Sequence, residues 1–278
     1  MTKSTYNAIE KEYHCKLLVA AYWYSNPCEC CHIAYIPFII MAHSARNFKN
    51  NRKEVSMMEK KYYQQHGKTD IFKSYLVKNA EYTGKFEIPC LHQTSRLIPK
   101  KLITFSKALK STEYDAWIVF YEHDEAFIRI WRNPRKYLNI LKRFRGVMSP
   151  DFSMYRNMPL VMQAWSTYMS RALALWWQEN GIEVIPNVRF STEDSYEIVF
   201  QGIEKHSTVS VGTHGCFKRK LDREYFLMGF DKMMKTIEPK VVIIYGAAPQ
   251  KYFRKYDDYC HIIQFPSQFS MTHSNARR

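Results

Sequence analysis

The chain has 278 residues, of which 46% are hydrophobic and 15% aromatic, and this composition excludes an intrinsically disordered protein. The length allows one large core, or one core with a small appendage. Lysine and arginine outnumber aspartate and glutamate by 41 to 26, which gives a net charge of +15 and favours a polyanionic partner. A lysine-rich surface that only keeps the protein soluble is the alternative explanation of this charge.

Residues 1–80 lack the strand–helix alternation of the later sequence, and we expect a mostly helical appendage that does not fold independently. Residues 17–42 carry one formal charge, but a Ser-Asn-Pro sequence interrupts them, which favours a buried segment over a membrane span. We also expect no secretion signal, and the seven cysteines are then reduced thiols of a cytoplasmic protein.

Side chains of the types that bind zinc cluster in this region, at Cys28, Cys30, Cys31 and His32, with His14 and Cys15 upstream. Zinc ligands usually come in pairs with CxxC or longer spacing, and no second matching pair is present. Cys90 and His92 could complete a site across the fold, but buried thiols are the preferred interpretation. The metal content stays open.

Short apolar runs alternate with amphipathic segments over residues 81–270, which we interpret as one α/β domain, followed by a disordered tail at 271–278. The apolar runs predict strands at 87–91, 102–105, 117–122, 147–150, 183–188, 208–212, 241–246 and 261–265. The segments between them predict helices at 125–144, 158–180, 192–202, 222–236 and 249–256. Near-continuous apolar strands are typical of parallel sheets that are covered on both faces.

Repeated strand–helix units with right-handed crossovers allow two architectures. One is a (β/α) barrel, irregular or incomplete, and the other is an open doubly wound parallel sheet. Seven or eight strands without a GxGxxG or Walker sequence favour the barrel-like fold.

In both architectures ligands bind at the carboxyl ends of the strands, where loops and helix N-termini converge. Candidate catalytic groups at these positions, able to supply acid–base chemistry, are Asp151, His214 and Glu122. Candidate ligand- or phosphate-binding groups are Arg189, Asn187, Thr213, Cys216 and Tyr245. Further polar residues at the same strand ends are His123, Asp124, Ser149, Ser153 and Gln264. These side chains predict one shared site. Glu122, Asp124 and Asp151 also suit a divalent metal held by oxygen ligands, and the cofactor stays unknown.

Structural roles are the alternative for several of these residues. Asp124, Asp151 and Thr192 are also suited to capping the helices that follow them. An isolated histidine such as His214 is often only a hydrogen-bonding group. Cys216 is more typical of an inert apolar side chain than of a nucleophile.

Residues 131–145 combine aromatic side chains with a high density of arginine and lysine. Such interleaving can hold phosphates and stack on bases. An ordinary amphipathic helix explains the aromatic positions better, with Trp131, Tyr137, Leu138 and Leu141 facing inward. The role of the charges stays open.

Four stretches resemble a family of bacterial and phage proteins known as domain of unknown function 4417: WIVFYE at 117–122, GVMSPDFSMYRNMP at 146–159, VIPNVRF at 184–190 and VSVGTHGC at 209–216. The resemblance covers about residues 80–265. It implies a connection to phages or mobile elements, and it implies no established activity and no catalytic residues.

Three hypotheses for the function follow. The favoured one is a phage- or mobile-element-associated protein that binds or processes nucleic acid or nucleotides through Asp151, Arg189 and His214. The second is a small-molecule hydrolase or lyase on a barrel scaffold, and the third is a non-catalytic phage protein that docks on a host protein. Whether the protein is an enzyme is left open.

Overall fold

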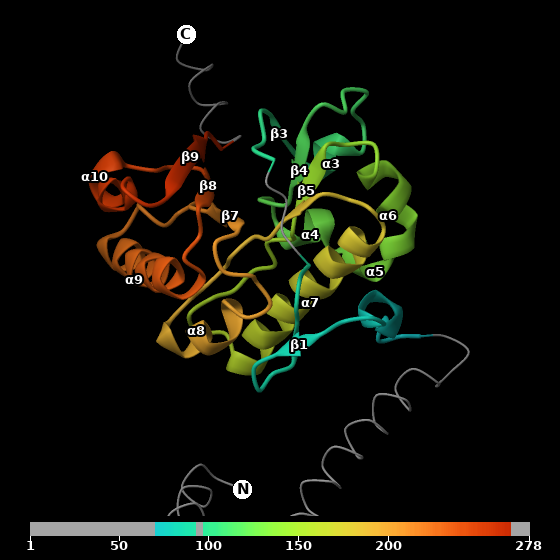
Figure 1. The fold of residues 1–278 in the computed structure, drawn as a ribbon, viewed down its shortest axis with the longest axis horizontal. Helices are drawn as coiled ribbons and strands as arrows, with labels where there is room; N and C mark the ends of the chain where they lie inside the picture. The colour runs from blue at the N-terminus through green and yellow to red at the C-terminus, as the bar shows by residue number, and fades with distance from the viewer. Residues whose placement is uncertain (1–69, 93–96, 268–278) are drawn as a thin grey trace, which may run out of the picture. The chain divides into compact units, whose positions relative to one another are not determined.

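The computed structural model describes residues 70–92 and 97–267. Parallel strands in this part of the chain lie side by side in the order in which they occur in the sequence (Figure 1). The first sheet contains β3 (Leu102–Thr104), β4 (Trp117–Val119), β5 (Gly146–Met148) and β6 (Val184–Ile185). The second contains β7 (Thr208–Gly212), β8 (Val241–Tyr245) and β9 (His261–Phe265).

One parallel bridge joins the two sheets, between Asn187 and Ser210. The backbone N–H of Val188 donates to the Ser210 carbonyl at 2.8 Å, and the Ser210 N–H donates to the Pro186 carbonyl at 2.9 Å. Because this bridge continues the pairing from β6 to β7, the two sheets form one array. Within the described residues no pairing joins β9 back to β3, so the array stays open.

The helices connect successive strands. Along the chain they are α3 (Phe105–Ala108), α4 (Asp124–Phe127), α5 (Arg129–Arg132), α6 (Pro134–Leu141), α7 (Leu160–Glu179), α8 (Glu193–Val199), α9 (Lys220–Ile237) and α10 (Gln250–Phe253). Short 3₁₀ helices are η2 (Ser74–Val77) and η3 (Arg254–Tyr256), and a small antiparallel pair is formed by β1 (Tyr82–Thr83) and β2 (Ile88–Pro89).

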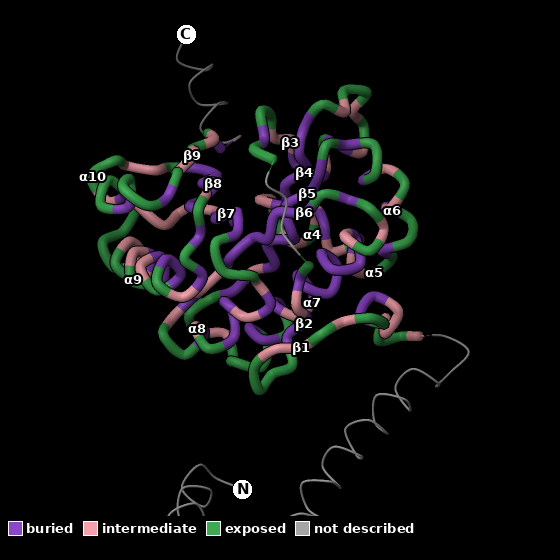
Figure 2. The backbone as a smooth tube through the Cα atoms, in the orientation of Figure 1, coloured by how far each residue is buried: buried purple, intermediate pink, exposed green. Residues whose placement is uncertain are grey.

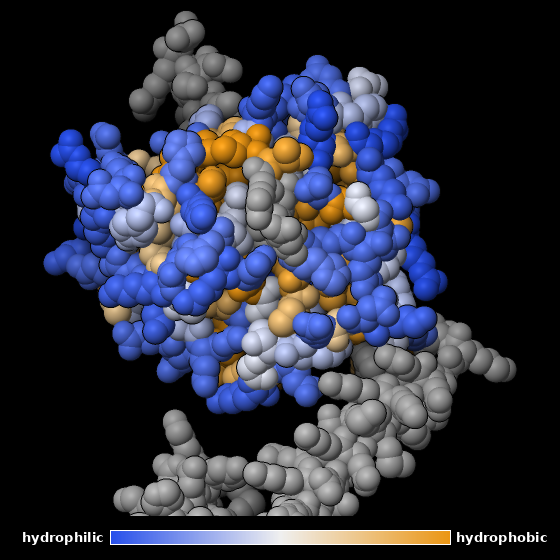
Figure 3. All heavy atoms as spheres, in the orientation of Figure 1, coloured by the Kyte–Doolittle hydropathy of each residue, from blue (hydrophilic) through white to orange (hydrophobic). Residues whose placement is uncertain are grey.

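Alternate side chains of each strand point to opposite faces and enter different apolar clusters. On the outer face, Ile118, Val147 and Val184 pack in one cluster with α3 to α7, while β7 and β8 pack in another with α9 and α10. On the inner face, Trp117 and Ile243 belong to a third cluster whose buried members are all strand residues. Figure 2 shows β4 to β8 and most of α7 as mainly buried, and Figure 3 shows hydrophobic atoms between β3 and β8–β9.

These features confirm the predicted α/β class. A sequential strand order and an inner face filled by strand side chains correspond to the irregular, incomplete form of a (β/α) barrel. A doubly wound sheet would reverse the strand order part-way and would carry helices on both faces.

The expectation of one helix over residues 125–144 is wrong. Three short helices, α4, α5 and α6, occupy this stretch. Pro134 has no N–H group and disfavours helical backbone in the preceding residue, and Asn133 accordingly has φ −140° and ψ 76°. The strand expected at 87–91 is also shorter than predicted, because only β2 pairs there, and it is antiparallel.

Several predictions fall outside the described residues. They concern the segment 17–42, the cluster Cys28, Cys30, Cys31 and His32 with His14 and Cys15, and the tail 271–278. Among the residues that the structure does describe, no helix is both long and apolar enough to cross a bilayer.

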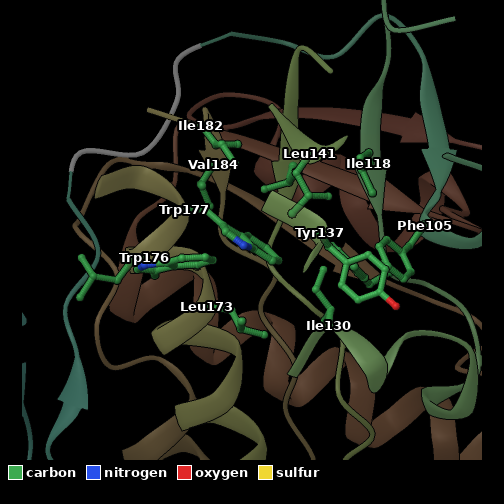
Figure 4. Packing of buried hydrophobic residues seen from close by; sticks show 14 of the residues in the cluster. Phe105, Ile118, Ile130, Tyr137, Leu141, Leu173, Trp176, Trp177, Ile182 and Val184 are labelled. Atoms are coloured by element: carbon green, nitrogen blue, oxygen red, sulfur yellow. The ribbon is translucent and has the colours of Figure 1, made fainter. Parts of the chain in front are cut away.

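Helix α7 contributes more buried residues to the largest apolar cluster than any other element. Trp177 and Leu173 contact Leu141, Ile130 and other residues of the largest apolar cluster (Figure 4). On another side of the same helix, Arg171 is 2% exposed, and its guanidinium donates to the carbonyl oxygens of Asn187, Val199 and Gln201 at 3.0–3.3 Å. Burial lowers the pKa of Arg171 to about 10, which still leaves it a cation at neutral pH.

Replacing Arg171 with Met should destabilise the fold by about 3 kcal/mol, because three buried carbonyl groups lose their donor. Urea unfolding measures the change. Lys235→Met, at an exposed position of α9, is the control and should change the free energy of unfolding by about 0.5 kcal/mol or less. Equal stabilities of the two variants would contradict the structural role of Arg171.

Candidate functional site

A cavity of about 560 Å³ lies at the carboxyl ends of β6 and β7. The loops after β5, β6 and β7 and the first turns of α9 form its wall. Its lining residues are Met154, Tyr155, Arg156, Asn157, Val188, Arg189, Phe190, Val211, Gly212, His214, Gly215, Cys216, Asp222, Tyr225 and Phe226. The cavity therefore lies at the strand ends where the sequence predicts a site. Its volume is typical of small-molecule sites, which span about 300–1,000 Å³.

An ion pair between Arg189 and Asp151 forms one side of the site. Arg189 Nη1 donates to Asp151 Oδ2 at 2.9 Å, and Asn187 Nδ2 donates to Asp151 Oδ1 at 2.7 Å. The Asp151 side chain is 9% exposed, whereas that of Arg189 is 35% exposed and reaches the cavity. The charge of Asp151 raises the pKa of Arg189, so the guanidinium is permanently charged.

A second layer of polar contacts fixes Asn187. The Asn187 backbone N–H donates to Ser149 Oγ at 2.8 Å, and Ser149 Oγ also accepts from Ser170 Oγ of α7 at 3.1 Å. Tyr121 Oη donates to Asn187 Oδ1 at 2.9 Å. Burial, with the Asp151 charge as a smaller cause, raises the pKa of Tyr121 well above its usual value, so this phenol is a constant donor.

The inner face of the strands supports this layer from behind. The rings of Tyr121 and Tyr245 stack with centroids 4.7 Å apart, and Tyr245 is 5% exposed. Gly212 leaves room for the Tyr121 ring, because a Cβ at that position would lie 2.8 Å from it. The predicted ligand group Tyr245 thus stands behind the cavity and is absent from its lining.

The hydroxyl, imidazole and thiol side chains of the VGTHGC sequence follow β7 and differ in their exposure to solvent. Thr213 is 2% exposed, and its hydroxyl donates to the Ala247 carbonyl at 2.8 Å, which ties the turn to the next strand end. Gly246, at φ +122°, permits this contact, since a Cβ there would lie 2.5 Å from Thr213 Oγ1. His214 is exposed and lines the cavity, as does Cys216.

The lining of the cavity contains a second ion pair, which the sequence does not reveal. Arg156 Nη1 donates to Asp222 Oδ1 at 2.7 Å, and its guanidinium lies 4.9 Å from the centroid of the Tyr225 ring. Arg156 follows β5 and Asp222 belongs to the first turn of α9, so this pair connects the loop after β5 to the start of α9. No spacing rule relates residues 66 positions apart.

The structure brings together Asp151, Asn187, Arg189, His214 and Cys216, but Glu122 lies elsewhere. Its carboxylate accepts from the backbone N–H of Ser106 in the first turn of α3 at 2.9 Å. Glu122 is thus occupied at a helix start and does not line the cavity. Gln264 donates to the Gly246 carbonyl at 2.8 Å and braces the turn.

The proposed capping roles are not observed. Helix α7 begins at Leu160, with Pro159 at the cap position, so Asp151 caps no helix. Asp124 instead accepts from the backbone N–H and hydroxyl of Ser153, and Thr192 precedes α8 without a side-chain cap bond. Among the described residues, no group of three or more His, Cys, Asp or Glu side chains is arranged to hold a metal ion.

Comparisons with known proteins identify the family of the chain. The family model "Domain of unknown function (DUF4417)" matches residues 80–266, which contain all the strands and helices around the cavity. The chain belongs to this family. All four stretches that carry the resemblance lie inside the match, so the expected membership is confirmed.

The curated relatives are phage proteins. The chain is 32% identical to "Gene 1 protein" of Mycobacterium phage L5 over 186 residues, which are 66% of this chain and 80% of the phage protein. It is 29% identical to "Gene 1 protein" of Mycobacterium phage D29 over 168 residues, or 59% of this chain and 62% of that protein. The protein is therefore phage-associated. No solved structure matches it.

Cys216 should react slowly with alkylating reagents. Burial raises its pKa to about 11 from an ordinary value near 9, an effect that the Arg189 charge partly opposes. At pH 8 its thiolate fraction, and hence its iodoacetamide rate, should be about 100-fold below that of an unhindered thiol. The rate should rise until about pH 11. Peptide mapping measures it, a short cysteine peptide is the control, and rapid alkylation at pH 7 would contradict the expectation.

Proposed function

We propose that the cavity binds a phosphate-bearing ligand of the nucleotide class, either a free nucleotide or the end of a nucleic acid strand. Arg189 carries this proposal. It is a permanently charged, partly exposed guanidinium held in a cavity of suitable size by a buried carboxylate. Its bond to Asp151 uses Nη1 alone, and its other nitrogens make no hydrogen bond within the described residues, so a planar donor edge remains for phosphate.

Aromatic rings supply the second requirement of a nucleotide site. Tyr155, Phe190, Tyr225 and Phe226 all line the cavity, and Tyr155 is 58% exposed. A nucleobase presents a flat face that stacks on such rings, while the phosphate needs a cation nearby. The combination of rings and a fixed guanidinium favours a nucleotide over a purely apolar ligand.

The charges around the cavity support an anionic ligand. The segment 216–223 contains four basic residues and one acid, and that acid, Asp222, is paired with Arg156. Asp151 is likewise paired with Arg189. Asp124, whose charge also acts on Arg189, is bonded to Ser153. The excess of basic residues in the segment 216–223 therefore favours an anionic ligand.

The experiment compares each deoxynucleoside monophosphate with the corresponding nucleoside by calorimetry on the full chain. The wild type should bind the phosphate form at least about tenfold more tightly, and Arg189→Gln should lose this preference, because the charge-assisted hydrogen bonds to phosphate disappear. Arg189→Lys keeps the charge without the planar edge and should retain part of the preference.

Arg254→Gln serves as the control with the same charge change, at an exposed residue of η3. It should bind like the wild type. A wild type that does not distinguish nucleotide from nucleoside, or a preference that survives Arg189→Gln, would overturn the proposal.

A further inference from the structure

Residues 128–145 contain seven basic residues and no acidic one. Elsewhere the charges are mixed, for example in α9, where Asp222, Glu224 and Asp231 alternate with lysine and arginine. A stretch without acids has no local counter-charges to neutralise it, so its field reaches further into solvent. This stretch corresponds to α5, α6 and the turn that leads to β5.

The fold sorts this stretch into an apolar and a basic side. Tyr137 and Leu141 of α6 point into the core, as Figure 4 shows, and Phe144 is buried as well. All seven cations of the stretch are exposed, but Arg129 bonds to the Ala126 carbonyl and Arg145 pairs with Asp115. The other five together we call the α6 basic face: Arg132, Arg135, Lys136, Lys142 and Arg143. In Figure 3 the side of the molecule that carries α5 and α6 is largely hydrophilic. The aromatic positions thus follow the amphipathic-helix interpretation, and the charges are left for solvent or for a partner.

Two of these arginines are fixed by stacking on tyrosines. The Arg135 guanidinium lies 4.2 Å from the centroid of Tyr75, and that of Arg143 lies 4.0 Å from the centroid of Tyr114. Tyr75 in turn packs edge-on against Trp176 of the core. A guanidinium stacked in this way keeps its N–H edges available, and it loses less freedom when it binds phosphate than a mobile side chain does.

The five cations also lack acidic partners. Arg145, next to the face, pairs with Asp115 at 2.7 Å, but none of the five forms an ion pair within the described residues. The large hydrophobic side chains that are exposed in the described part of the chain all lie outside residues 99–154. A membrane surface or a protein partner is usually recognised through exposed apolar or aromatic anchors, and α5 and α6 supply none.

We propose that the α6 basic face is a second binding surface, which contacts the sugar–phosphate backbone of a nucleic acid independently of the cavity. None of its residues lines the cavity, and Figure 1 shows α6 and α9 on opposite sides of the view. Contacts of this kind read no sequence, so the surface should bind any sequence through phosphates alone.

The test measures fluorescence anisotropy of a labelled DNA duplex, and of a single strand of equal length, with the full chain over a series of salt concentrations. The variant combines Arg132→Gln, Arg135→Gln and Arg143→Gln. Loss of three phosphate contacts should reduce the slope of log affinity against log salt by about 2–3 and weaken binding at low salt by about tenfold or more.

The matched control combines Lys232→Gln, Lys235→Gln and Lys240→Gln, which removes the same charge from exposed positions in and just after α9. It should change the slope by less than about 1, since only the long-range field is affected. A variant with Arg135→Lys and Arg143→Lys keeps the charge and loses the stacked guanidinium plane. It should retain the salt slope while binding about two- to fivefold more weakly.

Mononucleotide binding separates this proposal from the function proposed for the cavity. The arginine variant of the face should bind mononucleotides like the wild type, whereas Arg189→Gln should reduce the salt slope for duplex by no more than about 1, the contribution of a single phosphate contact. The proposal is overturned if the wild type does not bind DNA, if face and control variants weaken binding equally, or if the wild type binds only vesicles of anionic lipid.

Discussion

The guanidinium of Arg171 joins the long helix α7 to the loops that form the cavity. A buried cation needs a full set of hydrogen bonds, and this one obtains them from the carbonyls of Asn187, Val199 and Gln201 rather than from a carboxylate. Two of these carbonyls belong to the end of α8 and the turn after it, and the third follows β6. The neighbouring Ser170 bonds to Ser149 and to the Pro150 carbonyl. Two consecutive residues of α7 therefore set the position of the strand ends.

Hydrogen bonds connect Asn187 to the arginine that lines the cavity. Its carboxamide donates to Asp151 and accepts from Tyr121, and Asp151 holds Arg189. Exposure to solvent rises along this path, from the buried Arg171 to the Arg189 side chain, which is 35% exposed. A ligand that meets Arg189 would therefore meet a group whose orientation is already determined by the core, which lowers the entropy lost on binding.

Strand positions and the location of the site could be read from local sequence, because both depend on patterns within a few residues. The strands at 208–212 and 261–265 have the predicted bounds, and the strand-end rule places Arg189, His214 and Cys216 around one cavity. Pro134 also marks the break in the helix between β4 and β5, but the amphipathic pattern on either side of the proline favours a single helix.

What could not be predicted depends on contacts between distant residues. Glu122 bonds to the start of α3, and Arg156 pairs with Asp222, and neither partner follows from spacing in the chain. The same applies to the stacking of Tyr121 on Tyr245, which turns a strand-end tyrosine into a support behind the cavity. The solvent exposure of a strand-end side chain decides whether it can bind a ligand or has a structural role. That exposure is determined only when the strands pack together.

The bridge at Asn187 and Ser210 has a consequence for the mechanics of the molecule. It is the shortest strand pairing of the array. Two backbone hydrogen bonds form it, whereas the neighbouring strands of the second sheet pair over five residues each. The cavity lies beside this bridge, since Val188 and Arg189 follow the last strand of the first sheet and Val211 and Gly212 belong to the first strand of the second. A ligand in the cavity would contact both sheets and so stabilise the bridge between them. Amide hydrogen exchange at Val188 and Ser210 would therefore slow in proportion to the affinity of the ligand.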